Sequence, residues 1–129
     1  MNILSLDRTP LDASEILLTN ISVPPALNNL FFNIPGGGRA KTQGYKAWRR
    51  AAGFEVLAQR QPALKGPVEV AITIEDGASK ADIDGLLKGP IDLLVEMRLI
   101  DGDGPTVLRR VTAAYGDCKS MRIEVRAVT

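Results

Sequence analysis

Val68-Glu69-Val70-Ala71-Ile72-Thr73-Ile74-Glu75 is a segment in which an aliphatic residue occupies every second position. Successive side chains of a β-strand point to opposite faces of a sheet, so this spacing predicts a strand. A strict period of two over the whole segment does not fit a helix. The chain is therefore expected to contain a β-sheet, to which the flanking segments contribute further strands and a cover of helices.

Before this strand, the sequence predicts another strand, a loop and a helix. Residues 16–23 are rich in β-branched and aliphatic residues and end at a double proline, which is typical of a strand. Residues 28–44 combine asparagines, a proline and three consecutive glycines, which indicates a flexible basic loop. A helix is expected to begin at Thr42 or Gln43, because apolar residues follow at helical spacing: Tyr45, Trp48, Ala52 and Val56.

After the strand, residues 82–98 show the apolar spacing of a helix with one face toward the core. Pro90 lies inside this segment, so we expect either a short first turn followed by a restart or a kink near Leu86. Residues 106–115 and 119–128 are both strand-like, and we expect them to pair as a hairpin.

The order of these elements predicts an α+β fold, with one small mixed or antiparallel sheet packed with two helices. A length of 129 residues fits a single domain, here residues 1–129. Residues 1–13 show no sustained period and are expected to form a loose N-terminal extension. Apolar residues make up 45% and charged residues 24% of the chain, which excludes a wholly disordered chain, a collagen-like repeat and a coiled coil.

The residue types that are missing limit the possible chemistry. The chain has no histidine, which excludes the serine and cysteine triads built on it and most zinc sites. Cys118 is the single cysteine, so no internal disulfide is possible and a reducing compartment fits. Neither a secretory signal nor an apolar run of membrane-spanning length is present, so we expect a cytoplasmic protein without a membrane partner.

Positive charge is concentrated in one part of a nearly neutral chain. The formal net charge is +1, yet one short segment holds five basic residues and no acidic one: Arg39, Lys41, Lys46, Arg49 and Arg50. These side chains are candidates for contacts with DNA phosphates, which would not read sequence. The alternative is a solvated loop and helix face. Tyr45 and Trp48 could stack on bases, but their helical spacing favours a place in the core.

Two aspartates and a lysine form the first part of a candidate metal site. Asp82 and Asp84 are separated by one residue, so their carboxylates share a side only if Asp82 is extended. If Asp84 caps the helix that follows, Lys88 lies one turn further on. Two carboxylates and one ammonium group would then converge. The alternative is a helix cap with a second surface carboxylate, and a surface ion pair for Lys88.

Two later aspartates, Asp101 and Asp103, flank a glycine at the far end of the same predicted helix. A straight helix would leave them roughly 25 Å from the first pair, and the sequence alone does not show how they would meet. Oxygen ligands of this kind suit Mg²⁺ or Mn²⁺, which polarise a phosphate and activate a bound water. The alternative for the later pair, and the one favoured when the pair is taken alone, is a solvated turn.

The motifs together resemble the RusA family of four-way (Holliday) junction endonucleases of bacteria and their phages. The likeness spans roughly residues 16–128. It is carried by Val23-Pro24-Pro25 with Asn28, by the basic segment from Arg39 to Trp48, by Ala81-Asp82-Ile83-Asp84-Gly85-Leu86-Leu87-Lys88, by Ile91-Asp92-Leu93-Leu94 and by Leu99-Ile100-Asp101-Gly102-Asp103.

The resemblance implies an intertwined homodimer that resolves a four-way junction by paired symmetric nicks with Mg²⁺ or Mn²⁺. It places the catalytic aspartates at Asp82 and Asp84, the essential lysine at Lys88 and the later aspartate at Asp103 or, with a gap, Asp101. In a dimer the later aspartate can come from the other chain. The expected partners are branched DNA and a second copy, without a nucleotide cofactor, in a cytoplasm of bacterial, phage or prophage origin.

Two other functions remain open. Gly85 and Gly102 differ from the family pattern and weaken the acidic site. The first alternative is therefore a module of the same fold that binds branched DNA without cutting it. The near-zero net charge leaves a structural dimerisation protein with no nucleic-acid role.

Overall fold

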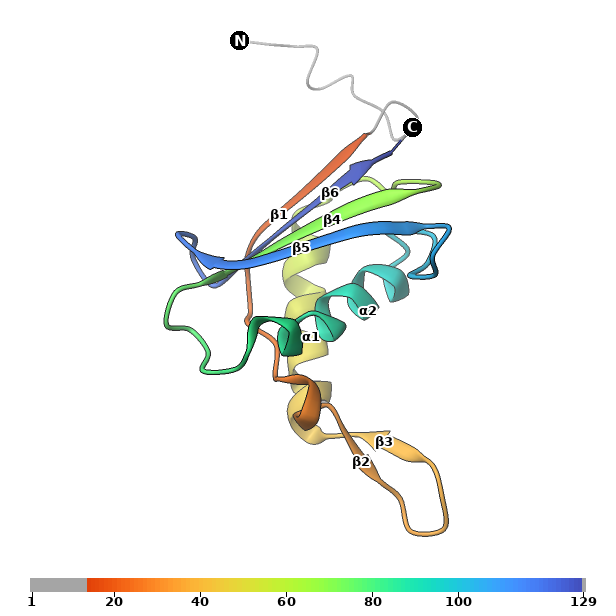
Figure 1. Cartoon of the computed structure of the whole chain (residues 1–129), viewed down its shortest axis with the longest axis vertical. Helices are drawn as coiled ribbons and strands as arrows, with labels where there is room; N and C mark the ends of the chain where they lie inside the picture. The colour runs from red at the N-terminus through yellow and green to blue at the C-terminus, as the bar shows by residue number, and fades with distance from the viewer. Residues whose placement is uncertain (1–13, 129) are drawn as a thin grey trace.

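The alternating segment forms strand β4 (Val68–Glu75) in the computed structural model, which describes residues 14–128. The four aliphatic side chains of β4 are buried, while Glu75 is exposed. The predicted α+β class is confirmed: a mixed four-stranded sheet carries two helices (Figure 1). The expectation for residues 1–13 lies outside the described residues.

The sheet has the order β1-β6-β4-β5, with β1 (Glu15–Ile21), β5 (Leu108–Gly116) and β6 (Met121–Ala127) around β4. Strand β6 is antiparallel to both of its neighbours, and β5 is parallel to β4. The predicted hairpin of residues 106–115 with 119–128 is therefore wrong, because β4 lies between these two strands.

The connection between β5 and β6 explains this error. Residues 117–120 carry the chain past the end of β4, where the Glu75 amide donates to Ser120 and the Asp76 amide donates to Gly116. Turn-forming residues predict that the chain reverses, but they do not predict which strand becomes the neighbour. The parallel pairing of β4 with β5 requires a crossover, and a helix supplies it here.

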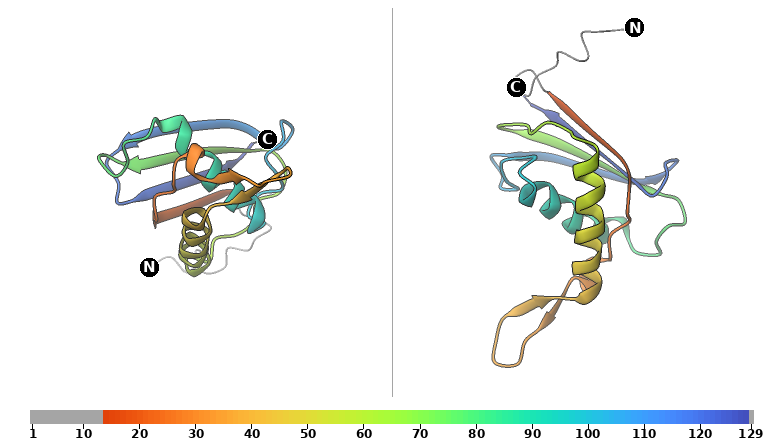
Figure 2. Two further views of the ribbon diagram at one scale, coloured as in Figure 1. Left: turned by 90° about the horizontal axis from the view of Figure 1, so that it is seen from below. Right: turned by 180° about the vertical axis from the view of Figure 1, so that it is seen from behind.

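Helix α1 (Gln43–Ala58) begins where the sequence predicts. Thr42 is its N-cap, and the Thr42 hydroxyl accepts a hydrogen bond of 3.1 Å from the Tyr45 amide. The helix ends before Arg60, whose positive φ of 50° turns the chain away. Both helices cover the same face of the four-stranded sheet (Figure 2).

The crossover consists of a short 3-10 turn, η4 (Ile83–Leu86), and then helix α2 (Lys88–Glu96). A first turn followed by a restart is one of the two arrangements that the sequence predicts. Pro90 is the third residue of α2, within the first turn, where its missing amide hydrogen breaks no helical bond. No helix in the described part of the chain is both long and apolar enough to cross a membrane.

The segment predicted as a loop, residues 28–44, contains a hairpin between the short turn η3 (Leu27–Asn29) and α1. Turn η3 leads into β2 (Phe31–Asn33), which pairs with β3 (Arg39–Lys41). This two-stranded sheet protrudes from the rest of the molecule (Figure 1). Its tip holds Gly36, Gly37 and Gly38, all with positive φ, a conformation that other residues rarely adopt.

Candidate functional site

The first aspartate pair lies on η4, just before α2. Asp82 occupies the N-cap of η4 in an extended conformation (φ −63°, ψ 143°), as its spacing requires. Asp84 lies in the first turn of η4 and does not cap α2, so the condition that would have placed Lys88 one turn beyond an Asp84 cap is not met. Leu87 occupies the N-cap of α2 and makes no capping bond, because the chain restarts there directly from the 3-10 turn.

The carboxylates of Asp82 and Asp84 are available to a ligand. Both residues are exposed, and within residues 14–128 neither carboxylate takes part in an ion pair or a side-chain hydrogen bond. Two exposed carboxylates are a donor set that Mg²⁺ accepts, since this ion usually keeps several waters and takes one or two protein carboxylates together with substrate phosphates.

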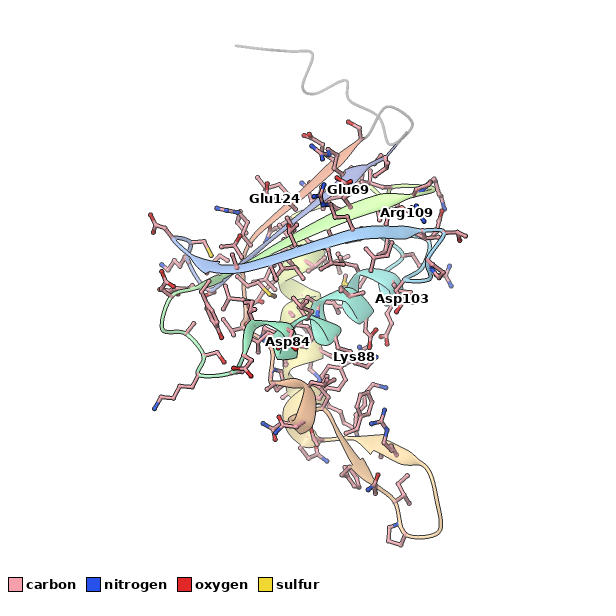
Figure 3. All side chains as sticks on the ribbon, in the orientation of Figure 1. Glu69, Asp84, Lys88, Asp103, Arg109 and Glu124 are labelled. Atoms are coloured by element: carbon pink, nitrogen blue, oxygen red, sulfur yellow. The ribbon has the colours of Figure 1, made fainter. Side chains whose placement is uncertain are left out.

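Lys88 is the first residue of α2, and its partner is a residue that the sequence analysis did not assign to the site. The Lys88 Nζ lies 3.0 Å from the Asp92 Oδ2, one turn further along the helix. The spacing of four residues is the signal that could have found this pair. Figure 3 shows Asp84 and Lys88 near the start of α2. Lys88 must therefore exchange Asp92 for a phosphate if it is to contact DNA.

The later aspartates lie beyond the opposite end of α2. Figure 3 shows Asp103 there, separated from Asp84 by the helix. Helix α2 has nine residues, a length of about 13 Å at 1.5 Å per residue. The restart before Pro90 shortens this helix but does not bring its two ends together.

Asp101 has a structural role in this position. Its Oδ2 accepts a hydrogen bond of 2.7 Å from the Gly66 amide, and its Oδ1 lies 3.6 Å from the Lys65 Nζ. Asp103, two residues later, is exposed. Of the two candidates for the later ligand, Asp103 is the one whose carboxylate is not used to hold the fold among the described residues.

The four candidate aspartates do not come together in one chain. Within residues 14–128, no group of three or more His, Cys, Asp or Glu side chains is close enough to hold a metal ion. Asp82 and Asp84 are exposed carboxylates, a residue type that Mg²⁺ takes together with water and phosphate, whereas Asp101 and Asp103 do not join them in the same chain.

The predicted DNA-binding residues lie on the hairpin and on the first half of α1. Arg39 and Lys41 belong to β3, and the Arg39 guanidinium lies 4.6 Å from the centre of the Phe31 ring. Lys46 and Arg50 are exposed on α1. Arg39, Lys46 and Arg50 are therefore open to a polyanion, while Lys41 is half-buried.

Arg49 differs from the other four basic residues because it is engaged within the protein. Its side chain is only 16% exposed, pairs with Glu96 of α2 and lies over the Tyr45 ring at 5.4 Å. This contact braces α1 against α2, so Arg49 is poorly placed for a phosphate contact.

Tyr45 and Trp48 belong to the core, the role that their spacing favours. Tyr45 is fully buried and stacks on Trp48, with ring centres 6.1 Å apart. The Trp48 indole donates a hydrogen bond of 2.7 Å to the Ser22 carbonyl. Neither ring is available to stack on a base.

The acidic segment lies next to the base of the basic hairpin. Turn η3, which leads into β2, contacts η4, and a Cβ added to Gly85 would lie 4.0 Å from the Leu27 amide nitrogen. The views of Figures 1 and 2 agree in placing η4 near the point where the hairpin leaves the body. Carboxylates and cations that are about forty residues apart in the sequence are thus brought to one region.

No protein-family model matches this chain, and no curated protein sequence matches it.

Proposed function

We propose that the protein is a metal-dependent endonuclease that binds four-way junction DNA and resolves it by paired symmetric nicks, acting as a homodimer. The observation that carries the proposal is the position of the exposed pair Asp82 and Asp84 beside the base of a cationic hairpin. The resemblance of the acidic and basic motifs to RusA-type nucleases supports the same activity.

Each group has a distinct role in this proposal. Asp82 and Asp84 would hold Mg²⁺, which would supply polarisation of the scissile phosphate and a lower pKa of a bound water. Lys88 leaves Asp92 and stabilises the charge that develops on the phosphate. Arg39 and the other exposed cations fix the DNA through its backbone, with no preference for sequence.

The partial metal site supports a dimer. A third carboxylate in the proposed site comes from the partner chain, because Asp103 lies beyond the far end of α2 in its own chain. We assign this role to Asp103 and not to Asp101, which binds the Gly66 amide. The site then depends on two chains, which couples cleavage to dimerisation.

The test is incubation of the purified protein with a synthetic four-way junction and Mg²⁺. We expect paired nicks from the wild type, none from Asp82→Asn, and a rate lower by about 10²–10³ from Lys88→Ala, the loss that follows removal of one group that stabilises transition-state charge. Asp117→Asn is the control, because Asp117 is an exposed aspartate in the connection between β5 and β6. Equal cleavage by wild type and Asp82→Asn would refute the assignment.

A second candidate function is a module of the same fold that binds branched DNA without cutting it. The observation in its favour is that the described residues of one chain do not gather three metal-binding side chains. Both candidates predict junction affinity that falls steeply as salt rises, because both rely on phosphate contacts. Binding with intact strands at every Mg²⁺ and Mn²⁺ concentration would favour the module.

A further inference from the structure

Two large apolar side chains are exposed on the protruding hairpin. Phe32 is 51% exposed and Ile34 is 41% exposed. Side chains alternate between the two faces of a strand, so these two residues share the face opposite to that of Phe31. Phe31 packs edge-on against Tyr45, with ring centres 5.6 Å apart. One face of the hairpin therefore rests on α1, and the other presents apolar groups to solvent.

The charges of the hairpin lie on its other face. Residues directly opposite each other in an antiparallel pair share a face, and Lys41 pairs with Phe31 while Arg39 pairs with Asn33. The chain has no acidic residue between Glu15 and Glu55. The hairpin thus has an exposed apolar face, and its charged side chains are all cationic. Nucleic acid matches both properties, because its bases are flat and apolar and its phosphates are negatively charged.

The base of the hairpin is held firmly, so the apolar residues are presented by an ordered element. The Thr42 hydroxyl donates to the Asn29 carbonyl at 2.7 Å, and the Thr42 amide donates to the Leu30 carbonyl at 2.9 Å. Leu30 is fully buried. At the tip, the Ile34 amide donates to the Gly38 carbonyl at 3.0 Å. Figures 1 and 2 show the hairpin extending away from the sheet.

We propose that this hairpin is a wedge that inserts Phe32 and Ile34 between bases at the branch point of a DNA junction. Arg39 and Lys41 then contact the phosphates beside the opened step. Apolar wedges of this kind separate neighbouring base pairs, and unstacking is least costly where pairing is already interrupted. The inference rests on the proposed binding of junction DNA, and it names the DNA feature that the protein recognises.

The experiment measures base unstacking directly, with a four-way junction that carries 2-aminopurine at the branch point and without Mg²⁺, so that no strand is cut. We expect the wild type to raise the 2-aminopurine fluorescence on binding, and Phe32→Ala to abolish this rise. Phe32→Ala should also weaken junction binding by about 5- to 150-fold, the effect of losing one base–aromatic contact. Phe32→Leu keeps an apolar wedge and should retain part of the rise.

The control is Leu17→Ala on β1, because Leu17 is 49% exposed, as Phe32 is, but lies on the four-stranded sheet. This variant should bind and unstack the junction as the wild type does. A wild type that binds the junction without a rise in fluorescence overturns the wedge. A Phe32→Ala variant that binds the junction as tightly as the wild type also overturns the wedge. That result would mean that the apolar face of the hairpin contacts another protein. A wild type that does not bind the junction refutes the proposed function itself, a result that differs from both.

Discussion

At the scale of single residues, Asp101 and Asp103 show how two identical side chains, separated by one glycine, can have different roles. Asp101 binds the Gly66 amide, and beside it the Leu64 amide donates to the Leu99 carbonyl. Together these bonds tie the segment after α2 to the loop that precedes β4. Asp103 is exposed and is free of such a task among the described residues.

This difference predicts opposite effects for the two aspartate-to-asparagine substitutions. Asp101→Asn should lower the free energy of unfolding by about 1 kcal/mol, because a charge-assisted hydrogen bond becomes a neutral one, and should retain junction cleavage while folded. Asp103→Asn should leave stability within about 0.5 kcal/mol and remove cleavage. Urea unfolding and a cleavage assay on the same preparations measure both. A reversed pattern would make Asp101 the later ligand.

At the scale of elements, the contact of α2 with the rest of the core depends on a glycine in its first turn. A Cβ added to Gly89 would lie 3.3 Å from the Trp48 ring and 3.4 Å from the Pro24 Cβ. The absence of a side chain lets α2 approach α1 and the segment after β1 closely.

Gly89→Ala is therefore expected to destabilise the protein by about 1–2 kcal/mol, since overpacking outweighs the better helix propensity of alanine. Gly53→Ala is the matched control, because Gly53 is also helical and a Cβ there would meet nothing within 4 Å. That substitution should stabilise by about 0.5–1 kcal/mol. Thermal melts of both variants and the wild type check this. If Gly89→Ala raised the melting temperature as much as Gly53→Ala does, α2 would not pack on Trp48 as described.

The elements also show which features the sequence could predict. Strand β4 and the start of α1 at Thr42 or Gln43 follow from local patterns and are confirmed. Pro90 predicts an interruption, and the structure shows which of the two expected forms it takes, a short turn followed by a restart. The order β6-β4-β5 could not be predicted, because it depends on pairing between distant segments. The hairpin of β2 and β3 was missed because strands of three residues are too short to show alternation beside a run of glycines.

In the candidate site, too, local features could be predicted from the sequence and tertiary contacts could not. The extended Asp82 followed from the spacing of the aspartate pair. The Lys88–Asp92 pair has a readable spacing of four residues, but the sequence does not decide whether Lys88 turns to Asp84 or to Asp92. The proximity of η4 to the hairpin arises from tertiary packing, which no local pattern reports.

At the scale of the whole molecule, the proposed active site is shared between two chains. This predicts complementation between two inactive proteins, Asp82→Asn and Asp103→Asn. In a dimer that combines them, one site has lost both groups, but the other has Asp82 from one chain and Asp103 from its partner. Coexpression should therefore restore nicking of one strand per junction, without paired nicks, as denaturing gels of labelled strands would show.

The matched control is coexpression of Asp82→Asn with Asp84→Asn. Both residues belong to the same η4 segment, so every site in that mixed dimer lacks one of them, and we expect no cleavage. Failure of the Asp82→Asn and Asp103→Asn mixture to cut, when sedimentation shows that mixed dimers have formed, would contradict the shared site.

The position of β6 between β1 and β4 also determines when the sheet can assemble during translation. Strand β6 is the last strand of the described chain to be translated, yet β1 bonds to no other strand of the sheet. Until β6 emerges from the ribosome, β1 stays without a neighbour and β4 keeps an unpaired edge. Assembly of this sheet is thus completed only after nearly all of the described residues have been made.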